Sequence, residues 1–350
     1  MFPYLEAAGW SVQFEPFVDE GFFSRFYSGG NRWEKATYLA SRSLSRLALA
    51  LRVADVDAVF VQREASLIGP PYVEGILSAV RGLPLIFDFD DAIWHYDLRR
   101  SKHQLAARLL KRPSKCWYTM RKAALVLAGS SFLAERAREV NPSVEVVPTV
   151  VSSATWTPLP GRLQGELGGH RIPRIGWVGS HSTAHQLELV LPALRRLRNQ
   201  GHRFELHVVG ADRSFDLDGF ALHARSWRLE DELREFQELD IGLAPMRGAP
   251  VYQGKCGFKQ LQYMSVGVPC VSSWVGGARD FVIDGENALV ALDEQDWYTH
   301  IKKLLESREL RARLASTGRR LIESRYCSER QGPRLAQLID NTLRQNHASR

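Results

Sequence analysis

The 350-residue sequence is long enough for two domains, each with its own hydrophobic core. Hydrophobic residues make up 45% of it and charged residues 24%, a balance typical of globular proteins and not of disordered chains. No run reaches the roughly 18–20 apolar residues that span a bilayer, and no signal peptide is recognisable. We expect a cytoplasmic protein, soluble or peripheral at the inner face of the membrane. The cysteines (Cys116, Cys256, Cys270 and Cys327) lack metal-binding spacing, so we expect reduced thiols.

The net charge is +7, and much of the excess lies in residues 99–122, which hold nine Lys and Arg residues and no acid. Interleaved Leu, Trp and Tyr residues make this segment a candidate surface for anionic lipid. A solvated basic helix explains the same pattern equally well. Nucleic acid is not an expected partner, because no nucleic-acid motif accompanies the charge.

Short apolar runs alternate with amphipathic segments along the chain, which predicts an α/β protein with parallel sheets. The expected strands are residues 11–17, 58–62, 84–88, 125–128 and 144–147, then 174–178, 204–209, 221–226, 240–244 and 269–273. Residues 151–172 are rich in Ser, Thr, Pro and Gly and are predicted to be a linker. We therefore expect domains at 1–150 and 173–328, and a C-terminal helix within 329–350 that packs back on the N-terminal domain.

A strand, a glycine turn and a helix start are predicted in residues 174–183. Thr183 and Gln186 have the spacing of a capping box, so the helix is expected to begin there. A dinucleotide-binding turn is disfavoured, because the GxGxxG pattern is not satisfied.

The most informative stretch is residues 254–291, where a glycine-rich entry opens a short helix and a second glycine turn follows. Helix N-termini attract phosphate. Spacing places Lys255, Lys259 and Gln262 on one stripe of the helix, beside an apolar stripe (Phe258, Leu261 and Met264) expected to face a core. The alternative is an ordinary solvated face, but the flanking glycines permit close approach of a ligand.

This stretch resembles the donor-sugar site of retaining GT-B glycosyltransferases of family 4. The residues that match are Gly257, Met264, Gly267, Pro269, Val275, Gly276, Gly277, Asp284 and Gly285. Gly254 and Gln262 stand where the family has two glutamates, and Asp280 replaces a third. The match is closer to a branch with the pattern GKxGFKxxQYM.

The resemblance implies two doubly wound, Rossmann-like domains facing a cleft, the GT-B layout. In the family, a central strand and a glycine-rich loop precede the helix that residues 2–9 resemble. Neither stands in this sequence, so we expect either that the true start of the domain lies upstream or that the N-terminal domain lacks its first strand.

The motif LIFDFDD, residues 85–91, permits three interpretations. Asp88 and Asp90 fit a phosphatase D-x-D, with the first Asp as nucleophile, or a metal-binding D-x-D under a diphosphate. The third interpretation is a strand end in the lysine-containing branch, which also explains the residues that follow, Ala92, Ile93 and Trp94. There the carboxylates would orient an acceptor hydroxyl or act as a base, or they would only cap the next segment.

The resemblance implies a retaining, metal-independent glycosyltransferase that moves a sugar from a nucleotide-diphosphate sugar to a saccharide or lipid-linked acceptor. It needs no cofactor and no metal site. Family members carry an Arg and a Lys after the first glycine turn of the second domain; here AHQLELV follows, so we expect Lys255 and Lys259 to supply that charge. The expected catalytic residues are Lys255, Lys259, Asp90 and Asp91, and the expected donor-binding residues are Gly179, Ser180, Ser182, Thr183, Gly257, Phe258, Gln262, Gly276 and Gly277.

Two other functions remain open. The absent strand and the replaced glutamates also fit a non-catalytic or degenerate GT-B subunit that binds nucleotide sugar or a partner transferase. A metal-dependent transferase or a phosphatase that uses Asp88 and Asp90 is a weaker alternative.

Overall fold

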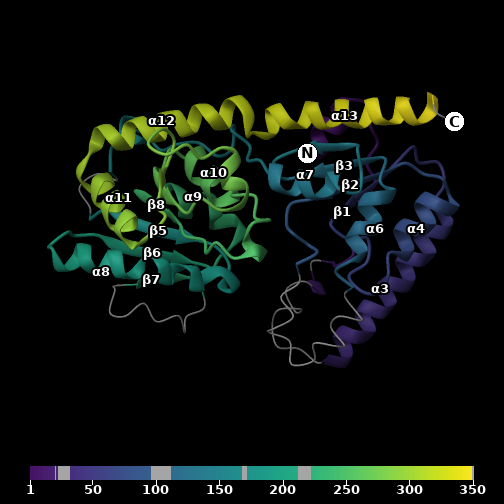
Figure 1. The fold of residues 1–350 in the computed structure, drawn as a ribbon, viewed down its shortest axis with the longest axis horizontal. Helices are drawn as coiled ribbons and strands as arrows, with labels where there is room; N and C mark the ends of the chain where they lie inside the picture. The colour runs from purple at the N-terminus through teal and green to yellow at the C-terminus, as the bar shows by residue number, and fades with distance from the viewer. Residues whose placement is uncertain (20, 23–31, 96–111, 168–171, 212–221, 349–350) are drawn as a thin grey trace. The chain divides into compact units, whose positions relative to one another are not determined.

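The computed structural model describes residues 1–19, 21–22, 32–95, 112–167, 172–211 and 222–348. The chain divides into two compact units (Figure 1). Unit 1 comprises Met1–Pro148 and Gly332–Arg350, and unit 2 comprises Thr149–Gln331.

Unit 1 is built on a sheet of four parallel strands, β1 (Val59–Gln62), β2 (Leu85–Phe89), β3 (Leu125–Ala128) and β4 (Val144–Val146), which lie side by side in chain order. The inner strands β2 and β3 are almost entirely apolar, as expected for parallel strands covered on both faces. Short helices connect them: α4 (Tyr72–Gly75), η1 (Ile76–Val80), α6 (Lys115–Lys122) and α7 (Ser131–Arg138).

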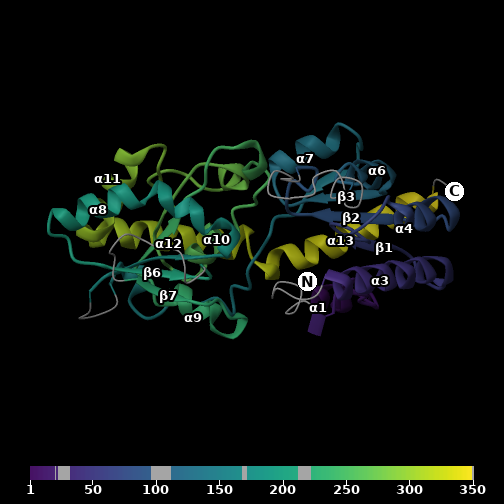
Figure 2. The ribbon, with the colours of Figure 1, turned by 90° about the horizontal axis from the view of Figure 1, so that it is seen from below.

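The two ends of the chain cover one face of this sheet. Helix α13 (Ser328–Ala348) runs along the sheet in both views of the ribbon (Figures 1 and 2). Four of its apolar residues share a core with strand residues and with helix α1 (Phe2–Ala7): Leu335, Ala336, Ile339 and Leu343. Gly332 permits this packing, because any side chain there would overlap the Tyr4 ring.

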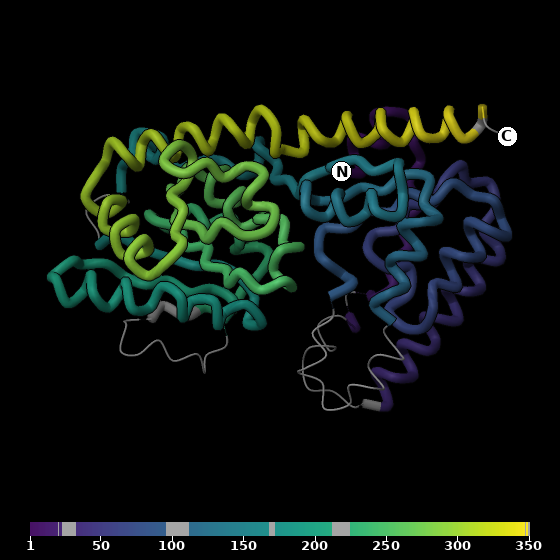
Figure 3. The backbone as a smooth tube through the Cα atoms, in the orientation of Figure 1, coloured from purple at the N-terminus to yellow at the C-terminus, as the bar shows by residue number. Residues whose placement is uncertain are grey.

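The long helix α3 (Arg32–Arg52) belongs to a second, smaller core of unit 1. Ala50 of α3 is buried against Val73 of α4 and Leu77 of η1, and Figure 3 shows these segments running next to each other.

Unit 2 contains six parallel strands in the order β10-β9-β8-β5-β6-β7. Their bounds are β5 (Arg174–Val178), β6 (Glu205–Val209), β7 (Leu222–Arg225), β8 (Ile241–Ala244), β9 (Cys270–Ser272) and β10 (Leu289–Val290). The chain builds outward from β5 to β7, then returns to the other side of β5 with β8. This is the doubly wound order, with its switch point between β5 and β8.

Both faces of this sheet are buried. Ile175 and Trp177 of β5 point into a core shared with η4 (His181–Leu189), α8 (Leu191–Asn199) and α11 (Glu294–Glu306). Val178 of the same strand belongs to the opposite core, formed with α9 (Glu232–Gln237), α10 (Phe258–Ser265) and α12 (Arg308–Arg325). The period-two alternation of a strand sends neighbouring residues to opposite faces.

The described part of the segment expected to be a linker packs onto unit 2. It contains a short helix, η3 (Arg162–Gln164), and Arg162 is only 4% exposed. The Arg162 guanidinium pairs with Asp240, whose carboxylate also accepts a hydrogen bond from the Arg174 backbone N–H at 2.8 Å. A buried ion pair of this kind needs such additional hydrogen bonds to offset its desolvation.

Nine of the ten expected strands are confirmed, with ends shifted by no more than one residue. The expected strand 11–17 is wrong: these residues form no ladder in the described chain. The Arg42 and Arg46 side chains instead bind the backbone carbonyls of residues 15–17, and Pro16 has no N–H to donate. Strand β10 was not predicted, since two residues show no periodicity.

None of the described helices has the length and apolar composition needed to cross a bilayer. In the basic segment 99–122, residues 99–111 lie outside the described part of the chain. Within α6, Lys115 is buried and pairs with Glu64 at 2.6 Å, so this cation does not face solvent.

Candidate functional site

The switch point of unit 2 brings together most of the sequence motifs. The helix that follows β5, η4, packs on one face of the sheet, and the helix that follows β8, α10, packs on the opposite face. Open parallel sheets bind ligands at this position, beyond the strand carboxyl ends. Gly179 follows β5 there, and Pro245 follows β8. The same edge receives the N-terminus of α10, because Tyr263 anchors this helix. The Tyr263 hydroxyl lies 3.1 Å from the carbonyl oxygens of Gly176 in β5 and Leu243 in β8.

The turn after β5 is closely packed. The Gly179 N–H donates to the Val209 carbonyl at 3.0 Å. Gly210 has φ +83°, and an added Cβ there would overlap the Gly179 carbonyl oxygen. At Gly179 an added Cβ would overlap the Trp177 ring and come within 2.7 Å of Lys259 Nζ. Glycine is therefore required at position 179, because a larger side chain would not fit there.

Hydroxyl groups follow this turn. Ser180 Oγ lies 2.8 Å from Ser182 Oγ and 3.4 Å from Thr183 Oγ1. The expected capping box is wrong: the helix is a 3₁₀ helix that begins at His181, and Thr183 Oγ1 donates to the Ser180 carbonyl. Gln186 is engaged elsewhere, because its Oε1 accepts a hydrogen bond from the Arg247 N–H at 2.9 Å.

Helix α10 begins after Gly257, which has φ +73°. A side chain at this position would be strained and would lie 3.0 Å from the Phe281 ring. The helix starts at Phe258, so Lys255 lies outside it. The prediction that Lys255 and Lys259 lie on one stripe of the helix is therefore wrong. Phe258 is also 38% exposed and does not face the core as expected.

Lys259 lies under the Gly179 turn. Its Nζ is 3.8 Å from the centroid of the Trp177 ring, a cation–π contact. Within the described residues it makes no hydrogen bond or ion pair with an acid. Part of the side chain remains accessible, yet burial lowers the pKa of Lys259 well below its usual value. An ammonium group in this setting is poised for an anionic partner.

Gln262 lies one turn further along α10 and is 5% exposed. Its Nε2 is buried without a hydrogen-bond partner in the described structure. Since buried polar groups are normally hydrogen-bonded, this amide is available to a ligand oxygen.

The second glycine turn holds the loop in front of α10. Gly276 has φ +62° and begins η7 (Gly276–Asp280). The Gly277 N–H donates to the Lys255 carbonyl at 2.7 Å. A Cβ at Gly276 would overlap this same carbonyl. Gly276 and Gly277 thus fix the backbone of Lys255.

A polar network lies at the same edge. His185 Nε2 lies 3.1 Å from the Tyr252 hydroxyl and 3.0 Å from Gln186 Nε2, and Arg247 pairs with Glu188 at 2.7 Å. These contacts connect η4 to the loop that follows β8. The sequence resemblance places Arg247 and Tyr252 near this site, and the fold adds their contacts with His185 and Glu188.

Unit 1 carries the aspartates of the LIFDFDD motif at the carboxyl end of β2. Asp90 pairs with Arg63 at 2.6 Å, and Asp91 accepts a hydrogen bond from the Ala92 N–H at 2.9 Å. Arg63 follows β1 with φ +61°, and its N–H donates to the Asp88 carbonyl oxygen at 2.7 Å. Asp90 and Asp91, the two expected catalytic aspartates, are thus both engaged.

The Asp88 carboxyl makes no hydrogen bond or ion pair with a described residue. Burial and the neighbouring Asp90 carboxylate raise the pKa of Asp88 to about 7, although Arg63 acts in the opposite direction. A carboxyl group with this pKa exchanges protons near neutrality. The sequence placed Asp88 in the motif but could not show that it is the unengaged aspartate.

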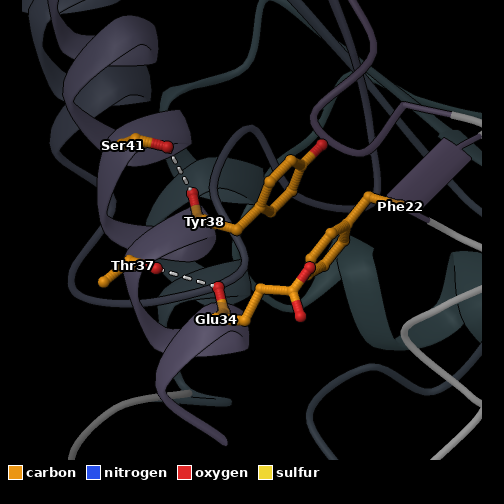
Figure 4. Close-up of a pocket in the computed structure, with 5 residues that line it drawn as sticks. All are labelled: Phe22, Glu34, Thr37, Tyr38 and Ser41. Carbon is orange, nitrogen blue, oxygen red and sulfur yellow. Dashed lines mark hydrogen bonds between the residues drawn. The ribbon is translucent and has the colours of Figure 1, made fainter. Parts of the chain in front are cut away.

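Among the described side chains, no three His, Cys, Asp or Glu residues converge as metal ligands. A hollow of about 350 Å³ lies beside α3 in unit 1, lined by Phe22, Glu34, Thr37, Tyr38 and Ser41 (Figure 4). The Phe22 and Tyr38 rings stack there, with their centroids 3.6 Å apart. It contains none of the expected site residues.

Comparisons with known proteins agree with this arrangement. Residues 172–307 match the family model "Glycosyl transferases group 1". A search of curated proteins gave no match.

The fold is similar to those of solved sugar transferases. Anabaena HepE in complex with UDP and glucose has a TM-score of 0.64 and 16% identity, over 89% of this chain and 83% of that one. Sucrose-phosphate synthase from Thermosynechococcus elongatus has a TM-score of 0.63 and 15% identity, over 92% and 81%. A UDP-forming trehalose-phosphate synthase from Burkholderia xenovorans has a TM-score of 0.60 and 12% identity, over 90% and 80%. The chain therefore has the GT-B fold, and its second unit contains a glycosyltransferase domain, which makes it a transferase enzyme.

Proposed function

We propose that this chain is a retaining glycosyltransferase of the family 4 type. It would transfer a sugar from a nucleotide-diphosphate sugar to a saccharide or lipid-linked acceptor of a surface polysaccharide, without a metal ion. The observation that carries the proposal is the Lys259 ammonium, which lies beneath the Gly179 turn without an acidic partner in the described chain.

The donor diphosphate would lie over Gly179 and in front of the α10 N-terminus. Free N–H groups of the first helical turn and the Lys259 ammonium would stabilise the charge that develops as the diphosphate departs. Lys255 would add a second cation, from a loop that Gly276 and Gly277 hold in place. These groups would supply the charge that a metal ion supplies in other transferases.

The rest of the donor would be held by neutral groups. Backbone around Gly257 and Phe258 would contact the sugar, and the unpartnered Gln262 Nε2 would donate to a ribose hydroxyl. The hydroxyls of Ser180, Ser182 and Thr183 are suited to phosphate oxygens. Anabaena HepE has been solved with UDP-glucose, so UDP-glucose is the first donor to test.

On the acceptor side, the aspartates of β2 would orient the attacking hydroxyl. Asp90 is held by Arg63, and Asp91 by the Ala92 N–H, so these two would position the acceptor. Asp88, with its pKa raised to about 7, would accept the hydroxyl proton. In the transfer step the acceptor oxygen would bond to the anomeric carbon on the same face that the diphosphate leaves, as retention requires. The bond from that carbon to the diphosphate oxygen would break, and the hydroxyl proton would pass to Asp88.

The location of the acceptor is part of the same proposal. A lipid-linked acceptor would bring the enzyme to the inner face of the membrane, where the basic segment 99–122 would contact anionic lipid. Lys115 would not take part, because it is buried against Glu64.

The proposal is tested by calorimetric titration with UDP, GDP and ADP in the presence of a chelator. We expect one of them to bind saturably, and Lys259→Met to weaken that binding strongly while leaving a residual affinity that can still be measured. Lys302→Met is the matched control, because Lys302 is a partly exposed lysine of unit 2 that pairs only loosely with Glu306, at 4.0 Å. Binding that requires a divalent ion would contradict metal independence, and folded protein that binds none of the three would favour the degenerate-subunit alternative.

A further inference from the structure

Lys259 is held by an aromatic ring instead of an acid. The Trp177 side chain is 1% exposed and packs with Ala184 and Leu187 in one core of unit 2. Its ring faces the Lys259 ammonium at 3.8 Å. The ring position is thus fixed by β5 and the core, while the lysine comes from α10 beyond the switch point.

The Gly179 turn covers one side of the contact between Lys259 and Trp177. Gly179 passes so closely that an added Cβ would overlap the ring and approach Lys259 Nζ to 2.7 Å. The turn cannot withdraw freely, because its N–H is bonded to Val209 and its carbonyl oxygen lies against Gly210. The ammonium therefore has one defined place, directly under the backbone that we propose contacts the diphosphate.

An acidic partner would neutralise Lys259 and compete with a phosphate ligand. The π face of an indole attracts a cation without carrying a charge of its own, so the positive charge stays available. No charged group of the described elements around it contributes to the lowered pKa of Lys259, which arises from burial alone.

We propose that Trp177 is a positioning residue of the donor site, whose ring holds the Lys259 ammonium under Gly179 for the diphosphate of a nucleotide-diphosphate sugar. This inference rests on the proposed function and adds a residue to it. Trp177 acts only through Lys259 and contacts no substrate itself.

A double-mutant cycle with Trp177→Phe and Lys259→Met isolates this role. Phe preserves an aromatic core residue but binds a cation more weakly than Trp does. We expect Trp177→Phe to weaken binding of the nucleoside diphosphate roughly 3- to 10-fold, with less than a 2-fold effect on the matching nucleoside. With Lys259→Met already present, we expect adding Trp177→Phe to cause no further loss of diphosphate affinity.

The pH dependence gives a second readout that a purely structural role would not change. The ring favours the charged form of Lys259, so a weaker ring lowers the pKa of Lys259 further. Diphosphate affinity should then decline at a lower pH in Trp177→Phe than in the wild type.

The two proposals fail in different ways. If the wild type binds no nucleoside diphosphate, both are overturned. If it binds one and Trp177→Phe weakens diphosphate and nucleoside equally, or weakens binding equally with and without Lys259, the Trp177 proposal alone is overturned. Circular dichroism and melting of each variant establish that the compared proteins are folded, and Trp177→Tyr replaces Trp177→Phe if the latter is not.

Discussion

The two units place their polar groups at the same kind of position, the carboxyl edge of a parallel sheet, but with opposite chemistry. Unit 2 has a switch point between β5 and β8. It presents glycines, hydroxyls and Lys259, which has no acidic partner in the part of the chain that the structure describes. In unit 1 the described strands follow chain order without a switch, and three aspartates at the end of β2 lie beside Arg63, which follows β1. An anionic donor fits the first edge, and a hydroxyl acceptor fits the second.

The difference also concerns which groups are engaged. In unit 1 the prominent charges of Arg63, Asp90 and Asp91 bind one another or the backbone, and only Asp88 is left unengaged among the described contacts. In unit 2, no acid among the described residues pairs with Lys259. A buried ionisable group without a pairing partner destabilises the folded protein, and such groups are characteristic of functional sites. Replacement of Lys259 and Asp88 therefore tests the comparison most directly.

The largest effect is expected for Lys259→Met. Removal of a charged group that stabilises a departing diphosphate should lower kcat by about 10²- to 10³-fold. The melting temperature should rise by about 2–4 °C, because a partly buried ammonium without an acid is replaced by an apolar side chain. Transfer assays and thermal melting measure both. A lower melting temperature with unchanged kcat would show that Lys259 is structural, and Lys302→Met should change neither.

Asp88→Asn tests the acceptor edge. Loss of the proton acceptor should lower kcat by about 10²-fold, with nucleotide binding unchanged. In the wild type, kcat/KM should fall as pH drops below about 7, where Asp88 becomes protonated. Asp91→Asn is the control: it keeps the oxygen that accepts from Ala92, so its pH profile should retain the same acidic limb. An unshifted acidic limb in Asp88→Asn would assign the titration to another group.

The pH dependence of the unfolding free energy should also reflect the Asp88 carboxyl group, and its direction can be predicted. The folded protein holds the Asp88 proton up to about pH 7, whereas an unfolded chain releases it near pH 4. The folded state therefore binds more protons between these values, and the contribution of Asp88 to stability declines as pH rises through this window. Relative to the wild type, Asp88→Asn should gain up to about 4 kcal/mol of unfolding free energy between pH 4 and pH 8, because the window spans about three pH units at about 1.4 kcal/mol each. Urea denaturation at both pH values measures this gain, and an equal difference at both would contradict it.

The smallest effect is expected at Glu329, which lies far along the sequence from both edges. Its carboxylate accepts hydrogen bonds from Ser152 Oγ at 2.8 Å and from the Ser153 N–H at 3.1 Å. Partial burial alone would raise the pKa of Glu329, but these and neighbouring backbone hydrogen bonds lower it to about 2. Its stabilisation is present above the usual Glu pKa and is lost as pH falls toward 2.

Glu329→Gln should therefore cost about 1 kcal/mol at pH 7 and almost nothing near pH 2, with kcat unchanged. Denaturation at the two pH values measures it. Glu286→Gln, at an exposed position of unit 2, should be neutral at both. A lower kcat in Glu329→Gln would mean that a packing change far from both sheet edges also affects turnover. The kcat losses at Lys259 and Asp88 would then not be specific to the two edges.

Much of the fold could be predicted from sequence because its signals are local. The runs that form β3 and β5 are short, apolar and bounded by turns, and both strands have the predicted ends. The turns at Gly179 and Gly276 were found because glycine is needed there for a close approach or a positive φ. The prediction of a strand at 11–17 was wrong because the alternating pattern is also compatible with an extended chain that arginine side chains hold in place.

The site was predicted in outline, and the missing parts depend on contacts between distant segments. Which aspartate is unengaged depends on Arg63, which comes from another strand. The exclusion of Lys255 from α10 follows from the packing of Gly257 against Phe281. The partnership of Trp177 with Lys259 exists only because the switch point brings β5 next to α10, and periodicity cannot show that.

Unit 1 is discontinuous in sequence, since Gly332–Arg350 complete a body that begins at Met1. The ribosome therefore delivers the sheet of unit 1 long before it delivers the helix that covers it. Unit 2 is a continuous segment and has all of its residues before α13 is finished, so it should reach its native state first. During that interval Ile86, Leu125 and Leu127 lack the apolar residues of α13 that bury them in the finished protein. The nascent chain should be most prone to aggregation and to chaperone capture at that stage.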